Sequence, residues 1–170
     1  MSLRDTIVKW LIEEDFIVSK LDVPPGAEVA WCISVSTPGV PTTRFTVLSP
    51  AGRSDKIILA MVVTISPEHR SELERLKPAE RVKVIHSILS KALAVCMDCK
   101  IGVQPNILNP QNIAINADVY EEEVSRYGKP YFMRLVARFL NTYFTIVSGF
   151  NEWFPVIPPS AKEREGTMFI

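Results

Sequence analysis

Apolar residues follow two alternating rhythms along this chain. In some stretches every second residue is apolar, which is typical of a strand with one buried face, and in others apolar residues recur every three or four positions, which is typical of a helix. In residues 28–36, for example, Trp31, Ile33 and Val35 alternate with Cys32 and Ser34. The first rhythm, together with runs rich in β-branched residues, predicts strands over Phe16–Leu21, Glu28–Ser36, Thr43–Leu48, Lys56–Ile65, Ile101–Gln104 and Asn112–Val119.

Helical spacing and proline positions predict the helices. A serine caps free backbone amides and a proline is tolerated at the first helical position, so Ser66-Pro67 is a helix start. We expect helices from Ser2 or Asp5 to about Glu14, over Ser66–Leu76, Pro78–Cys96 and Glu121–Tyr127, and, after a break near Gly128, from Pro130 to Phe154. The segment Pro105–Gln111, which contains Asn109-Pro110, is predicted to be a loop.

The order of these elements predicts the fold class. Runs of strands with helices segregated between them favour an α+β single domain, an antiparallel sheet with helices packed on one face, in the order α-βββ(β)-α-ββ-α. We expect this domain to span residues 1–154 and to be followed by a Pro-rich C-terminal tail, residues 155–170.

The last predicted helix is more apolar than a helix that covers one core needs to be. Such a helix requires an apolar stripe of roughly 100°, whereas two apolar rows run side by side here. The second row is Met133, Ala137, Leu140, Phe144 and Val147. One row belongs to the core and the other needs a different cover. We predict that an interface between two copies is formed by Phe132, Val136, Phe139, Tyr143, Ile146, Phe150 and Trp153. The alternatives are cover within the chain, by the first helix or the tail, and a ligand groove.

Composition and charge narrow the function classes. Nineteen basic and nineteen acidic residues cancel, which argues against nucleic-acid binding and against an anionic membrane surface. The longest apolar strand run, Ile57–Ile65, is far shorter than the roughly 20 residues that span a bilayer. Acidic residues interrupt the N-terminal apolar segment, so no signal peptide is expected. We predict a cytoplasmic protein, and the scarcity of glutamine with many prolines is typical of thermophile proteins.

The motif Cys96-Met97-Asp98-Cys99 is the one segment that suggests cysteine chemistry. In redox sites the reactive cysteine stands at a helix N-terminus, where the dipole favours the thiolate. Here the pair follows a helix C-terminus, which disfavours redox catalysis. Three interpretations remain open: free or structural thiols, which we favour, a structural disulfide, and a metal or redox site.

Other polar groups have a structural interpretation and a chemical one. His86, Cys96 and Asp118 are candidates to converge in a pocket between the C-terminal helix and the sheet. For His86 a hydrogen-bonded position at the edge of the core is favoured over catalysis. Consecutive helical residues lie about 100° apart, so Glu121–Glu123 are expected to diverge as a solvated helix start. We predict no cofactor and no metal.

The order of elements resembles the type III secretion chaperone-like fold, which secretion chaperones and YbjN-like proteins share. The segments that carry the resemblance are Ile7–Phe16, Glu28–Ser36, Lys56–Ile65 and the long helix from Pro130. They also resemble an uncharacterised, largely archaeal, domain-of-unknown-function family. The resemblance covers most of residues 3–154 and implies a dimer that binds other proteins and has no catalytic centre.

Two functional hypotheses follow. The first is a non-enzymatic homodimer that binds a protein or peptide partner, chaperone-like or adaptor-like. Its working surface would be the long helix or the sheet face away from the helices, with Glu28, Cys32, Ser34, Arg44 and Thr46. The alternative is a small-molecule binding protein or enzyme that uses the His86–Cys96–Asp118 pocket.

Overall fold

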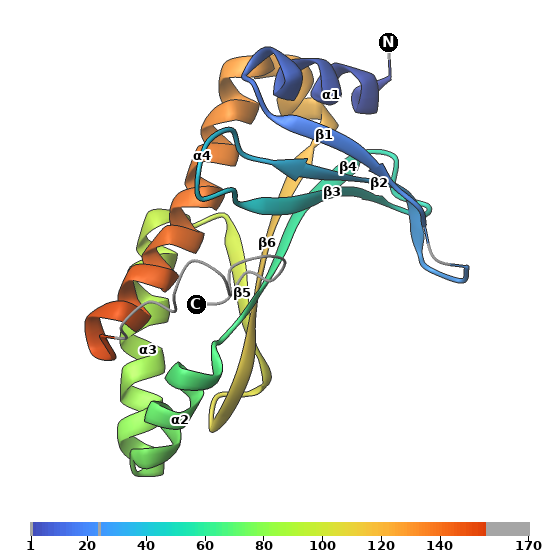
Figure 1. Ribbon diagram of the computed structural model, residues 1–170. Coiled ribbons are helices and arrows are strands. Elements are labelled where there is room, and N and C mark those ends of the chain that lie inside the picture. The colour runs from blue at the N-terminus through green and yellow to red at the C-terminus, as the bar shows by residue number, and fades with distance from the viewer. Residues whose placement is uncertain (1, 24, 156–170) are drawn as a thin grey trace. The chain divides into compact units, whose positions relative to one another are not determined.

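The computed structural model describes residues 2–23 and 25–155. Its strands form a six-stranded sheet in the order β1-β2-β3-β4-β6-β5 (Figure 1). The predicted α+β class, the antiparallel sheet and the order of elements are confirmed, whereas most of the predicted tail, 156–170, lies outside the described residues. The elements are α1 (Leu3–Glu13), β1 (Ile17–Leu21), β2 (Val29–Ser36), β3 (Arg44–Pro50), β4 (Lys56–Thr64), α2 (Pro67–Arg75), α3 (Pro78–Val95), β5 (Cys99–Asn106), β6 (Asn109–Tyr120) and α4 (Glu121–Trp153).

The described chain gathers into two compact units. Unit 1 consists of the described residues up to Met61 together with Asn116–Ala137. Unit 2 consists of Val62–Ile115 and the described residues from Arg138 onward. Strands β4 and β6 and helix α4 each contribute residues to both units, so each unit contains part of the sheet and part of the long helix.

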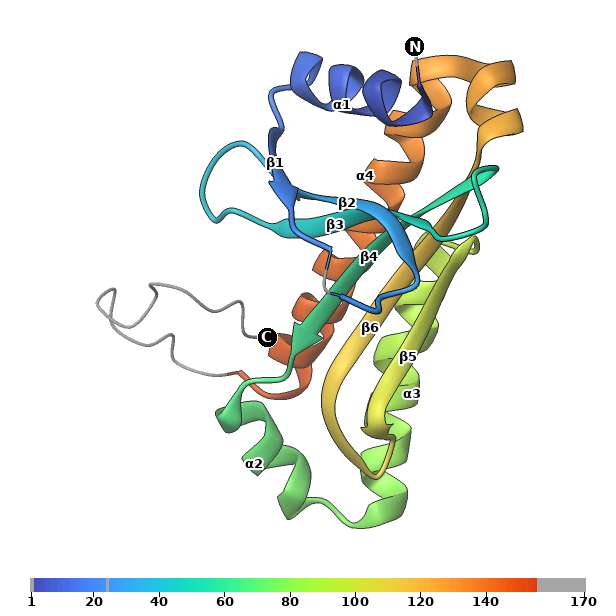
Figure 2. The same ribbon diagram turned by 90° about the vertical axis from the view of Figure 1, so that its right-hand side faces the viewer.

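Unit 1 is a sheet with helices against one face. Helix α1 approaches that face, because Arg4 lies over the Trp31 ring of β2 at 5.9 Å from its centre. The ring of Trp10 in α1 contacts that of Phe132 in α4, with 6.1 Å between centroids. Figure 2 shows α1, in dark blue, alongside β1 and β2. The buried face of the strands carries large apolar side chains that are at most 2% exposed: Ile33, Val35, Phe45, Val47, Ile57 and Leu59.

Helix α4 is broken at Gly128, as the sequence predicts. Gly128 has φ 66°, a left-handed conformation that glycine adopts without steric cost, and Pro130 opens the next helical segment. The neighbouring Lys129 Nζ lies 3.0 Å from a carboxylate oxygen of Glu13 and 2.7 Å from one of Glu14. These two ion pairs connect the break to the C-terminal end of α1.

The Lys129 contact is expected to make stability pH-dependent. The hydrogen bond from Lys129 holds the pKa of Glu13 below its ordinary value of 4.5. A carboxyl group with a lowered folded-state pKa stabilises the fold above its unfolded value, and this contribution is lost as pH falls through the lowered pKa. Lys129→Met should therefore lower the free energy of unfolding at neutral pH, and its difference from wild type should shrink below pH 4.5 in urea titrations.

Lys9→Met is the matched control, because Lys9 contacts the same carboxylate at 3.8 Å within one helix and is more exposed. Its effect should be smaller than that of Lys129→Met. An equal difference between Lys129→Met and wild type at neutral and acid pH would show that the ion pair contributes nothing.

Unit 2 packs helices α2, α3 and the second half of α4 with β5 and part of β6. Gly149 of α4 faces Ile88 of α3 so closely that an added Cβ would lie 3.0 Å from two Ile88 side-chain carbons. His69 of α2 is 1% exposed, its Nε2 lies 3.1 Å from the Phe154 carbonyl oxygen, and its ring contacts Phe150. These contacts join α3 and α2, respectively, to the end of α4.

The predicted loop over Pro105–Gln111 is wrong. Strands β5 and β6 extend through most of it and are connected by Ile107 and Leu108 alone. The Asn106 side-chain oxygen accepts hydrogen bonds from the backbone N–H groups of Leu108 and Asn109, both at 3.0 Å, and closes the turn. Pro105 is compatible with β5 because an edge strand has an outer side, on which the N–H groups form no ladder bond.

The row predicted to form the interface lies mostly in the core of the single chain. The exposed fraction is 1% or less for Phe132, Val136, Phe139, Ile146 and Phe150. Tyr143 is half-buried, and only Trp153, at 47%, is substantially exposed. The assignment of this row to a surface between copies is therefore wrong for its five buried members. In the second apolar row of this helix, which begins at Met133, Phe144 is 45% exposed.

Candidate functional site

The sheet of unit 1 has a second face, which carries the residues that alternate with the core positions. One row of apolar side chains crosses this face from strand to strand: Leu21 pairs with Cys32, Cys32 with Leu48, and Leu48 with Ile58. Leu21 is 38% exposed and the other three are half-buried. Because adjacent strands are about 4.8 Å apart, the row extends over about 14 Å.

A second row beside it consists of small side chains. Ser19 pairs with Ser34, Ser34 with Thr46, and Thr46 with Ala60. These side chains project little from the sheet: Ser19 is exposed, Thr46 and Ala60 are half-buried, and Ser34 is 7% exposed. The open face is defined here as these two rows together with Ile17, Ser36 and Arg44, which pair across the next register position.

The margin of the open face adds an exposed apolar group and a cation. Ile17 on the edge strand β1 is 64% exposed. Arg44 is exposed, and its Nε donates a hydrogen bond to the Ser36 hydroxyl at 3.4 Å. The open face therefore combines an apolar row, a flat strip of small residues and one guanidinium group. Such a face can pack against the side chains and backbone of another polypeptide.

Four of the five sheet-face residues named from the sequence lie on the open face: Cys32, Ser34, Arg44 and Thr46. Glu28 precedes β2 and lies in a turn, where its carbonyl oxygen accepts a hydrogen bond from Ala51 at 3.0 Å. The sequence reasoning missed Leu21, Leu48 and Ile58. Their alternation with core residues was a usable signal, but the pairing of the strands is needed to place them in one row.

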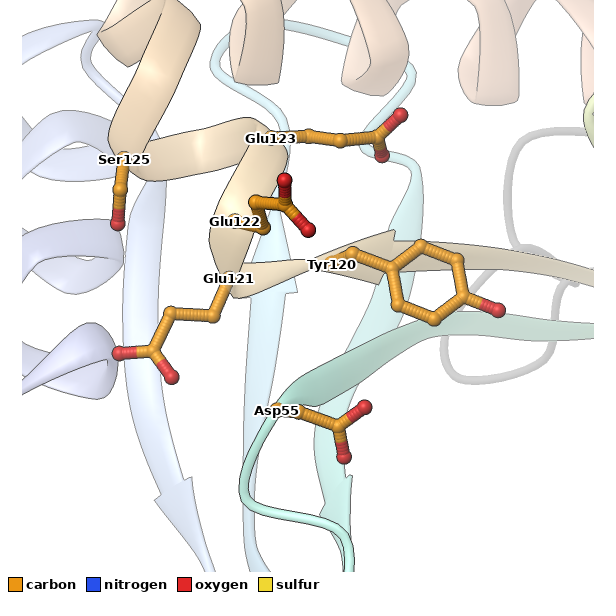
Figure 3. A pocket seen from close by; sticks show the side chains of 6 residues that line it. All are labelled: Asp55, Tyr120, Glu121, Glu122, Glu123 and Ser125. Atoms are coloured by element: carbon orange, nitrogen blue, oxygen red, sulfur yellow. The ribbon is translucent and has the colours of Figure 1, made fainter.

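An acidic hollow of about 520 Å³ lies at the start of α4. It is lined by Asp55, Tyr120, Glu121, Glu122, Glu123 and Ser125. Arg53 donates hydrogen bonds to both Asp55 oxygens, at 2.9 and 3.0 Å, which lowers the pKa of that carboxyl group. Figure 3 shows the carboxylates of Glu121 and Glu123 pointing in opposite directions, so these carboxylates diverge as the helical spacing predicts.

The three residues of the alternative pocket line neither this hollow nor the groove between α3 and α4. His86 is exposed on α3, where its Nδ1 lies 3.5 Å from the Ser90 hydroxyl. In unit 1, Asp118 forms an ion pair with Lys56 at 3.2 Å. Since His86 is exposed and Asp118 is ion-paired, no described contact supports the predicted pocket.

Cys96 and Cys99 are joined by a disulfide. The favoured interpretation, free thiols, is therefore wrong, and of the three that the sequence left open the disulfide is the one observed. The turn after α3 brings the two Cα atoms within 5.3 Å, a separation that a bridge requires. Cys32 is a free thiol on the open face.

Among residues 2–23 and 25–155, no three His, Cys, Asp or Glu side chains are grouped so that they could bind a metal ion. Within the same part of the chain, no helix combines the length and apolar content needed to cross a bilayer.

Sequence comparison identifies the family. A family model for an uncharacterized conserved protein, DUF2299, matches residues 3–150. The chain belongs to the DUF2299 family. This confirms the expected domain-of-unknown-function family. The search of curated proteins found no match.

Structural comparison supports the fold of this DUF2299 chain. It is similar to the crystal structure of an uncharacterized protein from Methanothermobacter thermautotrophicus, with a TM-score of 0.76, 16% identity, and coverage of 89% of this chain and 98% of the other. YbjN from E. coli gives a TM-score of 0.48 at 12% identity, covering 91% and 96%. At these identities the first likeness shows a shared fold, and the second supports no functional conclusion.

Proposed function

We propose that this protein is a non-enzymatic module that binds polypeptides on the open face of unit 1. The observation that carries the proposal is the apolar row Leu21–Cys32–Leu48–Ile58, which continues across four paired strands. Removing apolar surface from water contributes about 25 cal/mol per Å², so a partner that covers this row gains affinity from it. As the sequence predicts, we further propose that the protein is cytoplasmic and that its partner is not a nucleic acid.

The row of small residues makes the open face suited to a partner that packs closely against the sheet. Packed sheets lie about 10 Å apart when their side chains interdigitate, and the serine and alanine side chains at positions 19, 34 and 60 allow a neighbour to approach at least as closely. Arg44 at the margin can donate hydrogen bonds to backbone carbonyl or carboxylate groups of a bound chain. These features favour an extended, mainly apolar polypeptide, the type of segment that unfolded proteins expose.

Suppression of aggregation tests this function. Chemically denatured citrate synthase is diluted into buffer with and without the protein, and light scattering is recorded in the absence of reductant, so that the Cys96–Cys99 disulfide stays intact. Wild type should reduce the scattering. Leu48→Lys should weaken binding by about tenfold, because it places a charge in the centre of the apolar row.

Val40→Lys is the matched control, because Val40 is 99% exposed in a turn of the same unit and lies outside the open face. It should behave as wild type, and circular dichroism should show that both variants are folded. No suppression by wild type, or equal suppression by wild type and Leu48→Lys, would contradict the proposed function.

A further inference from the structure

A groove in unit 2 runs between α3 and the second half of α4. It encloses about 430 Å³ and is lined by Lys91, Val95, Asn141, Phe144, Thr145, Ser148, Gly149 and Glu152. Phe144 is 45% and Val95 36% exposed, so two apolar side chains of the groove face solvent. Figure 1 shows that the two helices run in opposite directions. None of these residues belongs to the open face.

An ion pair lies at each end of the groove, and the two pairs have opposite orders of charge. At one end Lys91 of α3 pairs with Glu152 of α4 at 3.0 Å, and at the other Arg138 of α4 pairs with Asp98, which follows α3, at 3.7 Å. All four side chains are more than half exposed. Helix α4 therefore carries the cation Arg138 at one end of the groove and the anion Glu152 at the other. Opposite them, Asp98 and Lys91 carry the reverse order of charges.

This pattern is self-complementary about a two-fold axis. Thr145 lies midway between Arg138 and Glu152 in the sequence and lines the groove. If a second α4 crosses the first in the antiparallel direction at Thr145, each Arg138 meets Glu152 of the other copy. Asp98 and Lys91 are brought together in the same way. An interface of this kind uses the same patch on both copies.

The charges at the two ends of the groove favour a second copy over other partners. Its two cations and two anions cancel, so it attracts neither an acidic nor a basic partner from a distance. A second copy presents matching charges at both ends. The small side chains of Thr145 and Ser148 allow two helices to approach closely, which places Phe144 against the apolar centre of the opposite groove.

We propose that a second copy of this chain occupies the groove, with the two α4 helices antiparallel about Thr145 and Arg138 of each copy paired with Glu152 of the other. The proposal uses other residues than the polypeptide-binding function, so either can fail without the other. In this proposal two copies associate through the exposed groove beside the aromatic row of α4, and not through that buried row.

Charge reversals and their mixture test the proposal by light scattering on a sizing column. Wild type at about 100 µM should have twice the monomer mass of 19.1 kDa. Arg138→Glu alone and Glu152→Arg alone each place like charges opposite one another and should be monomers. The equimolar mixture should recover the dimer mass, because the acidic 138 and 152 positions of the first variant meet the basic ones of the second.

Lys83→Glu, a reversal at an exposed α3 position outside the groove lining, is the control and should stay dimeric. A monomeric wild type, dimeric single variants, or a mixture of folded variants that remains monomeric would each overturn the proposal. Should a reversal unfold the chain by circular dichroism, Phe144→Asn takes its place. A dimeric Phe144→Asn variant would overturn the proposal equally.

Discussion

Replacing Phe139 by alanine is expected to lower the free energy of unfolding by about 3–5 kcal/mol, the usual cost of removing a buried aromatic ring. Phe139 is fully buried in α4. Phe144 lies five positions further along the same helix and is 45% exposed, so Phe144→Ala should cost less than about 1 kcal/mol at a protein concentration low enough to keep the chain monomeric. Urea unfolding of the two variants measures the difference directly.

The comparison separates a core role from an interface role for the aromatic row that contains Phe139. A core role requires that Phe139→Ala destabilises the chain by the same amount at low and high protein concentration, because the ring packs within one copy. Similar costs for Phe139→Ala and Phe144→Ala, or a cost for Phe139→Ala that appears only at high concentration, would contradict the burial of this row.

Replacing Gly149 by leucine is expected to cost about 2 kcal/mol. Its Cβ alone would lie 3.0 Å from Cγ1 and Cγ2 of Ile88, so the larger side chain must displace Ile88 or separate α3 from α4. Overpacking of this kind costs about 1–3 kcal/mol, and a gain in helix propensity of up to about 1 kcal/mol offsets part of it. Thermal or urea unfolding reports the net change.

Two companion variants make the Gly149 result specific. Gly102→Leu is the control, because no atom lies within 4 Å of an added Cβ at that position of β5. Combining Gly149→Leu with Ile88→Ala should cost less than the sum of the two single changes, since the leucine fills the space that isoleucine leaves. Additive costs would show that the helices do not meet at these residues.

The local elements were predictable because each depends on a short-range pattern. The alternation in Glu28–Ser36 places Ile33 and Val35 on the core face, and the structure confirms it. Gly128 and Pro130 marked the break in α4 for conformational reasons that are local to the backbone. The β5–β6 connection was missed because a proline indicates a loop unless its strand is known to be an edge strand, which only the pairing of strands shows.

The division of α4 between core and surface was not predictable in the same way. The helical spacing identifies two apolar rows, but the side chains that cover them come from distant parts of the sequence. Trp10 of α1 covers Phe132, and His69 of α2 contacts Phe150. Without those contacts both rows look equally suited to a core, and the larger aromatic residues pointed to the wrong one.

The open face was half predictable for a related reason. Alternation assigned Cys32, Ser34, Arg44 and Thr46 to the face away from the helices, and they lie there. The apolar row needed the register of three strand pairs, because Leu48 and Ile58 stand among other apolar residues and look like core positions when each strand is considered alone.

The central claim, that polypeptides bind to the open face, is tested most directly by photo-crosslinking from Cys32. A benzophenone maleimide attached to this free thiol without reductant stands in the middle of the apolar row and leaves the Cys96–Cys99 disulfide intact. The control carries the same label at Val40→Cys in a Cys32→Ser background. We predict that denatured citrate synthase is cross-linked from position 32 and not from position 40; cross-linking from neither position, or equally from both, would contradict the account.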